Sequence, residues 1–223
     1  MTPFRHTLLA ALAVPTVIVT TLVVPTVIVT TVAPGIAAAS TTRVAVAAPI
    51  DDPIADLAVA ALEALRVGGT TAAPEYVAAR ARLAVAVGGR LWTPGESFDQ
   101  AWARADMDHQ LALMAALTQL GVPYRRNALA PGVAFDCSGL TSFAWSKAGF
   151  DIPRNSTAQI RAAEPRNILT AQAGDLMRYP GHVMMWLGVG QAIIHAPFTG
   201  RHVEIKVLGS RSMSRSKFGD PTE

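Results

Sequence analysis

The sequence predicts an α+β fold, with helices packed on an antiparallel sheet and a helical segment in front of them. Apolar residues recur at helical spacing over much of residues 53–120. One further helix follows at about residues 137–149, and short apolar runs bounded by glycine, typical of strands, continue to about residue 208. The 223 residues suit one compact domain with additional segments rather than two full domains.

Charge and hydropathy limit the classes of partner. The formal net charge is +3, and the Lys and Arg residues form no block and no basic stripe interleaved with aromatic residues. We therefore expect no nucleic-acid binding, whereas attraction to an anionic wall polymer or membrane surface is compatible with the charge. Hydrophobic residues make up 51% of the chain, and much of this excess falls near the N-terminus, so the remainder has an ordinary globular composition.

The N-terminal segment has the features of an export signal. Arg5 precedes an uncharged stretch over residues 7–42, whose apolar part is lengthened by a repeat of VPTVIVTT. The run Ala37–Ala39 resembles a signal-peptidase site. We predict that residues 1–39 are a signal peptide and that the protein is exported to the cell envelope, periplasm or medium. The length of the stretch also fits the alternative of an uncleaved membrane anchor.

Residues 40–107 are predicted to be a helical or linker segment. Helical periodicity covers residues 53–66, where Asp52 is a suitable N-cap, and returns at residues 75–87. A glycine pair follows each stretch. The two helices carry no recognisable chemistry, so we interpret them as a helical hairpin or spacer; a docking or inhibitory role is the alternative.

Residues 108–208 are predicted to form the main domain, and residues 209–223 a flexible tail. A long helix is expected to end at Leu120, before a Gly-Val-Pro sequence. His109 on this helix lies between two polar neighbours, so we interpret it as a solvated surface residue. The tail is rich in Ser, Arg and Gly, a composition typical of disordered segments.

Cys137 is the one cysteine of the chain, which excludes an internal disulfide. It stands at the start of a helix that Gly149 is well placed to end. Unsatisfied backbone N–H groups and the helix dipole favour a thiolate there, and the same N–H groups could hold a developing oxyanion. The alternative is an inert core cysteine, but such a residue would sit more naturally on the apolar face in mid-helix.

Two histidines downstream could activate this thiol. His182 opens an apolar run, and His195 ends a second run after the intervening Gly188–Gln191. In a hairpin whose loop has two or four residues, both histidines lie on the same face as direct or diagonal neighbours. One can then act as a base while the other orients it, as in a nucleophile–base–orienter triad. Zinc bound by Cys137, His182 and His195 is the main alternative, but the spacing matches no common short zinc motif.

Six sequence markers resemble those of the NlpC/p60 family of cell-wall cysteine endopeptidases, which have a circularly permuted papain-like fold. They appear in the family's order over about residues 108–208, the predicted catalytic domain: LGVPYRR at Leu120–Arg126, FDCSGLTSFAWSKAG at Phe135–Gly149, IPRNSTAQ at Ile152–Gln159, AGDLMRY at Ala173–Tyr179, GHVMMWLG at Gly181–Gly188 and IIHAP at Ile193–Pro197. The resemblance covers just under half of the chain and also suggests an actinobacterial source.

The resemblance implies a catalytic triad and a reaction. Cys137 is similar to the family's nucleophile, His182 to its base and His195 to the polar residue that orients the base. Members typically cleave peptidoglycan stem peptides between D-glutamate and meso-diaminopimelate or lysine, without a metal or cofactor. The resemblance therefore implies that the protein binds peptidoglycan stem peptides as its partner.

The resemblance also implies residues that bind substrate. Tyr124 matches a tyrosine that assists substrate or oxyanion binding, and Asp136 and Ser138 match positions lining the pocket for the start of the stem peptide. Arg154 matches a position that we interpret as structural, paired with Asp136.

The sequence departs from the family at two places. Arg125–Ala128 replaces a usual glycine pair beside a substrate subsite, and bulky Met184–Trp186 follow His182, the expected base. Some relatives have lost the catalytic cysteine or histidine and only bind peptidoglycan, so a binding or scaffold protein of the envelope is the alternative function. A papain-like protease acting on proteins ranks lower, because the C-G-S-C-W signature is missing.

Overall fold

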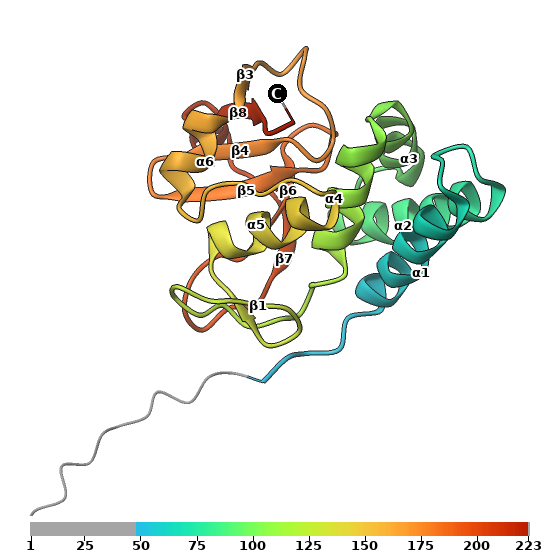
Figure 1. The fold of residues 1–223 in the computed structure, drawn as a ribbon, viewed down its shortest axis with the longest axis horizontal. Coiled ribbons are helices and arrows are strands. Elements are labelled where there is room, and N and C mark those ends of the chain that lie inside the picture. The colour runs from blue at the N-terminus through green and yellow to red at the C-terminus, as the bar shows by residue number, and fades with distance from the viewer. Residues whose placement is uncertain (1–47, 223) are drawn as a thin grey trace, which may run out of the picture. The chain divides into compact units, whose positions relative to one another are not determined.

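The computed structural model describes residues 48–222, so the predicted signal peptide or membrane anchor lies outside the described residues. Within residues 48–222, no helix has both the length and the hydropathy that crossing a bilayer requires. The helices are α1 Pro53–Gly68, α2 Pro74–Leu91, α3 Gly95–Arg104, α4 Met107–Leu117, α5 Cys137–Lys147, α6 Ser156–Ala162 and α7 Ser210–Met213. The strands are β1 Leu129–Ala130, β2 Ala134–Phe135, β3 Glu164–Arg166, β4 Leu176–Tyr179, β5 His182–Trp186, β6 Ala192–His195, β7 Glu204–Val207 and β8 Lys217–Asp220 (Figure 1).

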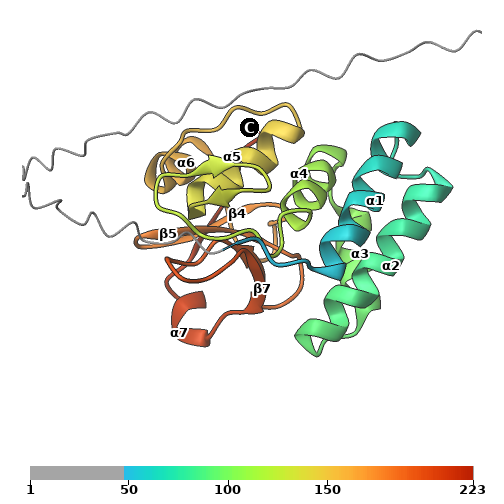
Figure 2. The ribbon, with the colours of Figure 1, turned by 90° about the horizontal axis from the view of Figure 1, so that it is seen from below.

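The predicted α+β architecture is confirmed. Six strands form one antiparallel sheet in the order β3-β8-β4-β5-β6-β7, and β1 and β2 pair separately. Helices α5 and α6 lie on one face of this sheet and α7 on the other (Figure 2). Each face of the sheet is therefore covered by helix, which lets both faces carry apolar side chains.

Strand β5 shows how its side chains are divided between the two faces. Val183 and Met185 join the main hydrophobic core, which includes residues of α5, whereas Met184 and Trp186 join a second core beneath α7. This alternation follows from the two-residue period of a strand. Of the bulky residues after His182, Met184 and Trp186 thus fill the second core, whose buried members are Met177, Met184, Trp186, Ile193, Leu208 and Phe218.

The helices before the sheet are not a spacer, contrary to our interpretation. They do form a hairpin, α1 against α2, but their buried side chains belong to the same hydrophobic core as those of α5 and the sheet. The indole N–H of Trp102 donates to the Leu187 carbonyl at 2.9 Å, and Tyr76 donates to Gln110 on α4 at 2.7 Å. Helix α4 lies between α1 and α5 (Figure 2). The segment is thus an integral part of the folded unit.

Two helix boundaries differ from the expectation, both because of contacts between elements. Helix α2 continues through its glycine pair, and a Cβ on Gly88 would lie 2.8 Å from the Cα of Gly95, so this glycine permits the close approach of α3. The long helix expected to reach Leu120 is broken between α3 and α4 at Ala105, which is extended. The following N–H, of Asp106, donates to Gln172 at 2.8 Å.

The prediction of a flexible tail is wrong. Residues 210–213 form α7, and β8 inserts between β3 and β4, with Pro165 opposite Gly219 and Leu176 also opposite Gly219. A Cβ on Gly219 would lie 2.8 Å from that of Ala163, so the glycine lets the strand fit under α6. The polar composition of residues 209–223 does not predict a strand, but β8 is stabilised because it pairs with a neighbouring strand on each side.

Candidate active site

Cys137 occupies the first position of α5, as the sequence predicts. Asp136 caps the helix, and its carboxylate accepts the Gly139 N–H at 2.6 Å. The backbone N–H groups of Cys137 and Ser138 have no acceptor within residues 48–222. Cys137 is half-buried against the main core. A sulfur at this place lies beside the positive end of the helix dipole, where an anion is stabilised.

Arg154 fixes the cap residue. Its guanidinium forms a two-pronged ion pair with both carboxylate oxygens of Asp136, each at 2.9 Å, and also donates to the hydroxyl of Ser138 at 2.9 Å. Nη2 of Arg154 also donates to the Ala128 carbonyl at 3.0 Å. The expected pairing of Arg154 with Asp136 is confirmed. Because planar, bidentate pairs hold a fixed geometry, the start of α5 is rigidly positioned.

His182 and His195 meet on one face of the sheet, as the hairpin argument predicts. Leu187 donates to Ala192 across the four-residue loop, and Nε2 of His182 lies 2.7 Å from Nδ1 of His195. Both side chains are buried, 7% and 5% exposed. Burial, and then the nearby His195 and Lys206, lower the pKa of His182 to about 3; burial, Lys206 and Arg201 do the same for His195. Both imidazoles are therefore neutral at pH 7, and each has one unprotonated nitrogen.

Two tyrosines lie close enough to Cys137 to be affected by its charge. Burial, and then the charge of a Cys137 thiolate, raise the pKa of both Tyr124 and Tyr179, which places both phenols within electrostatic reach of the thiol. The ring of Tyr179 lies 5.4 Å from that of His182. The Cys137 thiol itself makes no hydrogen bond to either histidine in the described part of the chain. Catalytic hydrogen bonds are often long until substrate binds, so the lack of this bond does not exclude proton transfer between Cys137 and a histidine.

Comparison with known proteins identifies the sheet-bearing part of the chain. Residues 121–220 match the model of the NlpC/P60 family. These residues form an NlpC/P60 domain. The match ends on β8, in agreement with the structured tail.

Relatives of the NlpC/P60 domain come from actinobacteria, among others. A probable endopeptidase of Corynebacterium glutamicum is 46% identical over 90 residues, covering 39% of this chain and 42% of the relative. Peptidoglycan endopeptidase RipA of Mycolicibacterium smegmatis is 30% identical over 121 residues, covering 47% and 24%. The crystal structure of the P60 domain of an antigen from M. avium subspecies paratuberculosis is 26% identical, covering 52% and 96%, with a TM-score of 0.45. The chain thus spans less than half the length of these two endopeptidases.

The NlpC/P60 domain accommodates its missing glycine pair with an asparagine. Asn127 has φ 60°, a left-handed conformation that glycine adopts freely and asparagine tolerates better than most residues. Ala128 closes the turn by donating to the Arg125 carbonyl at 3.1 Å. The carbonyl of Ala128 is then so close to α5 that a Cβ on Gly139 would lie 2.1 Å from it. The turn therefore closes without a glycine pair and leaves the side chains of Arg125 and Arg126 exposed beside Tyr124.

Sequence reasoning missed two side chains of the site. Tyr179 pairs directly with His182 across a turn of Pro180 and Gly181 (φ 86°), and the Pro-Gly signal of that turn could have revealed the pairing. Glu204 pairs directly with His195 across β6 and β7, and its carboxylate lies 3.3 Å from Nε2 of His195. The loop between these two strands is long, so their register could not be read from the sequence.

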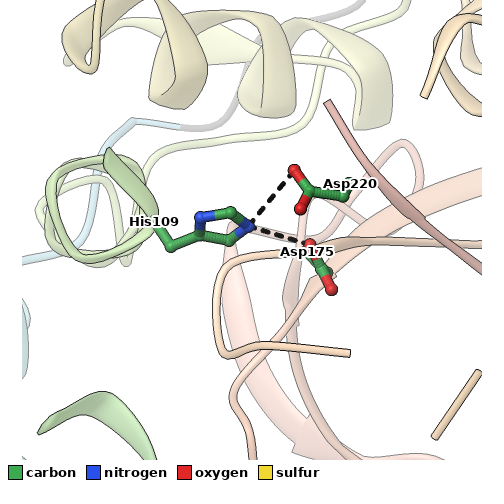
Figure 3. A group of neighbouring side chains, drawn as sticks. All are labelled: His109, Asp175 and Asp220. Atoms are coloured by element: carbon green, nitrogen blue, oxygen red, sulfur yellow. Dashed lines mark hydrogen bonds and ion pairs between the residues drawn. The ribbon is translucent and has the colours of Figure 1, made fainter. Parts of the chain in front are cut away.

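His109 is buried, not solvated as we predicted. It is fully enclosed because α4 lies between two layers, and its Nε2 lies 3.0 Å from Asp175 and 3.4 Å from Asp220 (Figure 3). The three donor atoms lie within 4.8 Å of one another, a spacing that would also suit a metal ion. The carboxylates, however, already accept bonds from protein donors: Thr222 and Arg166 at Asp220, and the Gln172 N–H at Asp175. We interpret the group as a buried polar cluster in which His109 joins α4 to the sheet by hydrogen bonding.

Proposed function

We propose that the chain is a peptidoglycan hydrolase, a cysteine endopeptidase exported to the cell envelope. The observation that carries the proposal is the placement of Cys137 at the start of α5, with a buried, hydrogen-bonded pair of neutral histidines on the adjoining hairpin. Family membership and the names of the relatives, "probable endopeptidase" and "peptidoglycan endopeptidase", support the same activity.

In the first half of the reaction, His182 removes the proton from the Cys137 thiol. The thiolate attacks the scissile carbonyl carbon, a C–S bond forms, and the carbonyl electron pair moves onto oxygen. The unoccupied N–H groups at the start of α5 and the Tyr124 hydroxyl stabilise that oxyanion. Collapse of the intermediate breaks the C–N bond, and the imidazolium of His182 gives its proton to the leaving amine, which departs and leaves a thioester.

In the second half, His182 removes a proton from water, which attacks the thioester carbonyl. The C–S bond breaks, the new carboxylic acid leaves, and the proton on His182 returns to sulfur. His195 orients the base throughout, since its Nδ1 is in hydrogen-bond contact with Nε2 of His182.

The proposed substrate is the stem peptide, cut between D-glutamate and meso-diaminopimelate or lysine. Asp136 and Ser138 are our candidates for binding the start of that peptide. Both are largely enclosed and are engaged by Arg154, so we expect them to act as a fixed polar wall rather than as mobile groups. Mass analysis of the products from a defined muropeptide identifies the bond.

Substitution of the triad tests the activity. Cys137→Ala and His182→Ala should each abolish release of peptides from purified peptidoglycan, and His195→Ala should weaken it less. His202→Ala is the matched control, because the ring of this half-buried histidine bonds to the Ala48 carbonyl and not to His182 or His195, so its loss should leave activity unchanged. If the Cys137→Ala variant releases the same products as the wild type, the proposal is wrong.

A peptidoglycan-binding protein without activity is the second candidate, favoured by the missing hydrogen bond between Cys137 and His182. Alkylation by iodoacetamide at pH 6 separates the two, because an ordinary thiol with a pKa of about 8.5 scarcely reacts there. The enzyme predicts rapid alkylation that slows in His182→Ala. Slow alkylation at the same rate in both proteins would indicate the binding protein.

A further inference from the structure

The contact between the two histidines requires one donor and one acceptor. Nε2 of His182 and Nδ1 of His195 are 2.7 Å apart, and both rings are buried beside the cations Lys206 and Arg201, which oppose protonation. Each neutral imidazole carries a single N–H, on one of its two nitrogens. Two arrangements are therefore available, and only the one in which His182 donates leaves Nδ1 of His182 unprotonated.

Glu204 distinguishes these arrangements. Its Oε1 lies 3.3 Å from Nε2 of His195, and its other oxygen is paired with Arg201. A carboxylate held by a guanidinium can accept a hydrogen bond but cannot donate one. Nε2 of His195 must then carry the proton for the contact to be attractive, and Nδ1 of His195 becomes the acceptor for the N–H of His182.

We infer that Glu204 is a positioning residue that sets the tautomers of both histidines. Through His195 it places the proton of His182 on Nε2 and leaves a lone pair on Nδ1, the nitrogen that remains for the thiol proton. The inference rests on the proposed role of His182 as the base. Protonation of His182 at Nδ1 requires no rearrangement, because its Nε2–H already donates to His195. The tautomer of a histidine is commonly fixed by the bond at its other nitrogen, here through two rings in series.

Nitrogen NMR of the full chain tests the inference without relying on activity. The chain has five histidines, so single His→Gln substitutions assign every ring. We expect Nε2 to be protonated in both His182 and His195 at pH 7. In Glu204→Leu the acceptor is lost, and a second tautomer should appear in both rings. Glu204→Gln, whose amide oxygen can still accept, should retain the original tautomers.

Kinetics give a second measurement. Glu204→Leu should lower kcat about 10-fold or more with little change in KM, as for other residues that orient a functional histidine, and Glu204→Gln should restore most of the loss. Glu164→Leu is the matched control, since this exposed glutamate on β3 lies outside the site. Circular dichroism verifies that each variant folds.

The outcomes separate the inference from the proposed function. Protonation of His195 at Nδ1 in the wild type, or unchanged tautomers in Glu204→Leu, would overturn the role of Glu204 even if the enzyme cleaves peptidoglycan. A wild-type protein that cleaves no stem peptide would instead refute the activity, and the NMR spectra would still report whether Glu204 sets the two rings.

Discussion

Substitution of His109 by leucine should strongly destabilise the fold. The histidine stands between Asp175 and Asp220 in a fully enclosed position, at the contact between α4 and the sheet. Leucine can occupy much of the same space but offers no N–H. The two carboxylates, whose oxygens lie within 4.8 Å of each other, would then face one another without the group that bridges them.

The magnitude follows from this spacing. Two unit charges within 4.8 Å of each other repel by at least about 3 kcal/mol at an effective dielectric constant of about 20. Leaving a buried polar group without its hydrogen-bond partner costs about 1–3 kcal/mol, and more for a charged group, which is in the same range. Burial already raises the pKa of Asp175, and without His109 this pKa should rise further. Protonation of Asp175 then relieves the repulsion, so the cost of the substitution should shrink as the pH falls.

Urea unfolding at pH 7 and pH 5 measures this cost, with tryptophan fluorescence as the signal. Trp145 packs edge-on against His109, with ring centroids 5.0 Å apart, and so reports on the site. The double variant His109→Leu/Asp175→Asn should recover part of the stability lost in the single variant, since it removes one carboxylate charge. A loss below about 1 kcal/mol at pH 7, or an equal loss at both pH values, would refute this account of the buried cluster.

Two further predictions concern the active site. The folded-state pKa values of His182 and His195, about 3, lie below the ordinary 6.5, so the unfolded chain binds more protons between these values. The free energy of unfolding should therefore fall as the pH drops from 6.5 towards 3, by up to about 1.4 kcal/mol per pH unit for each histidine. Melting temperatures measured across this range test the prediction. A melting temperature that does not change with pH would show that the rings are solvated. Gly139→Ala should cost about 2–3 kcal/mol or more, because the added methyl group meets the Ala128 carbonyl. Gly89→Ala is its control: nothing lies within 4 Å, and alanine in α2 should stabilise by up to about 1 kcal/mol in the same thermal melts.

Features set by local sequence could be predicted. The start of α5 at Cys137 follows from a polar cap before an apolar period, and the meeting of His182 with His195 follows from the length of the Gly188–Gln191 loop. In both cases neighbouring residues determine the geometry, so no knowledge of the tertiary structure was needed.

Features set by distant partners could not be predicted. His109 has polar neighbours along the chain, yet both sides of α4 are covered by other helices, which no local pattern reveals. Strand β8 has only four residues, and its neighbours along the chain are polar. It forms because β3 and β4 hydrogen-bond to it on either side. The contact of Glu204 with His195 likewise depends on strand register across a long loop.

The position of β8 has a consequence for the order of folding. The strand follows every other element along the chain, yet it lies inside the sheet and separates β3 from β4. During synthesis or export, β3 cannot join the sheet before residues 217–220 emerge, and Asp220 cannot reach His109. Truncation a few residues before Lys217 should thus leave a gap in the sheet rather than a shortened end, and an affinity tag fused behind β8 would be held beside the edge strand β3.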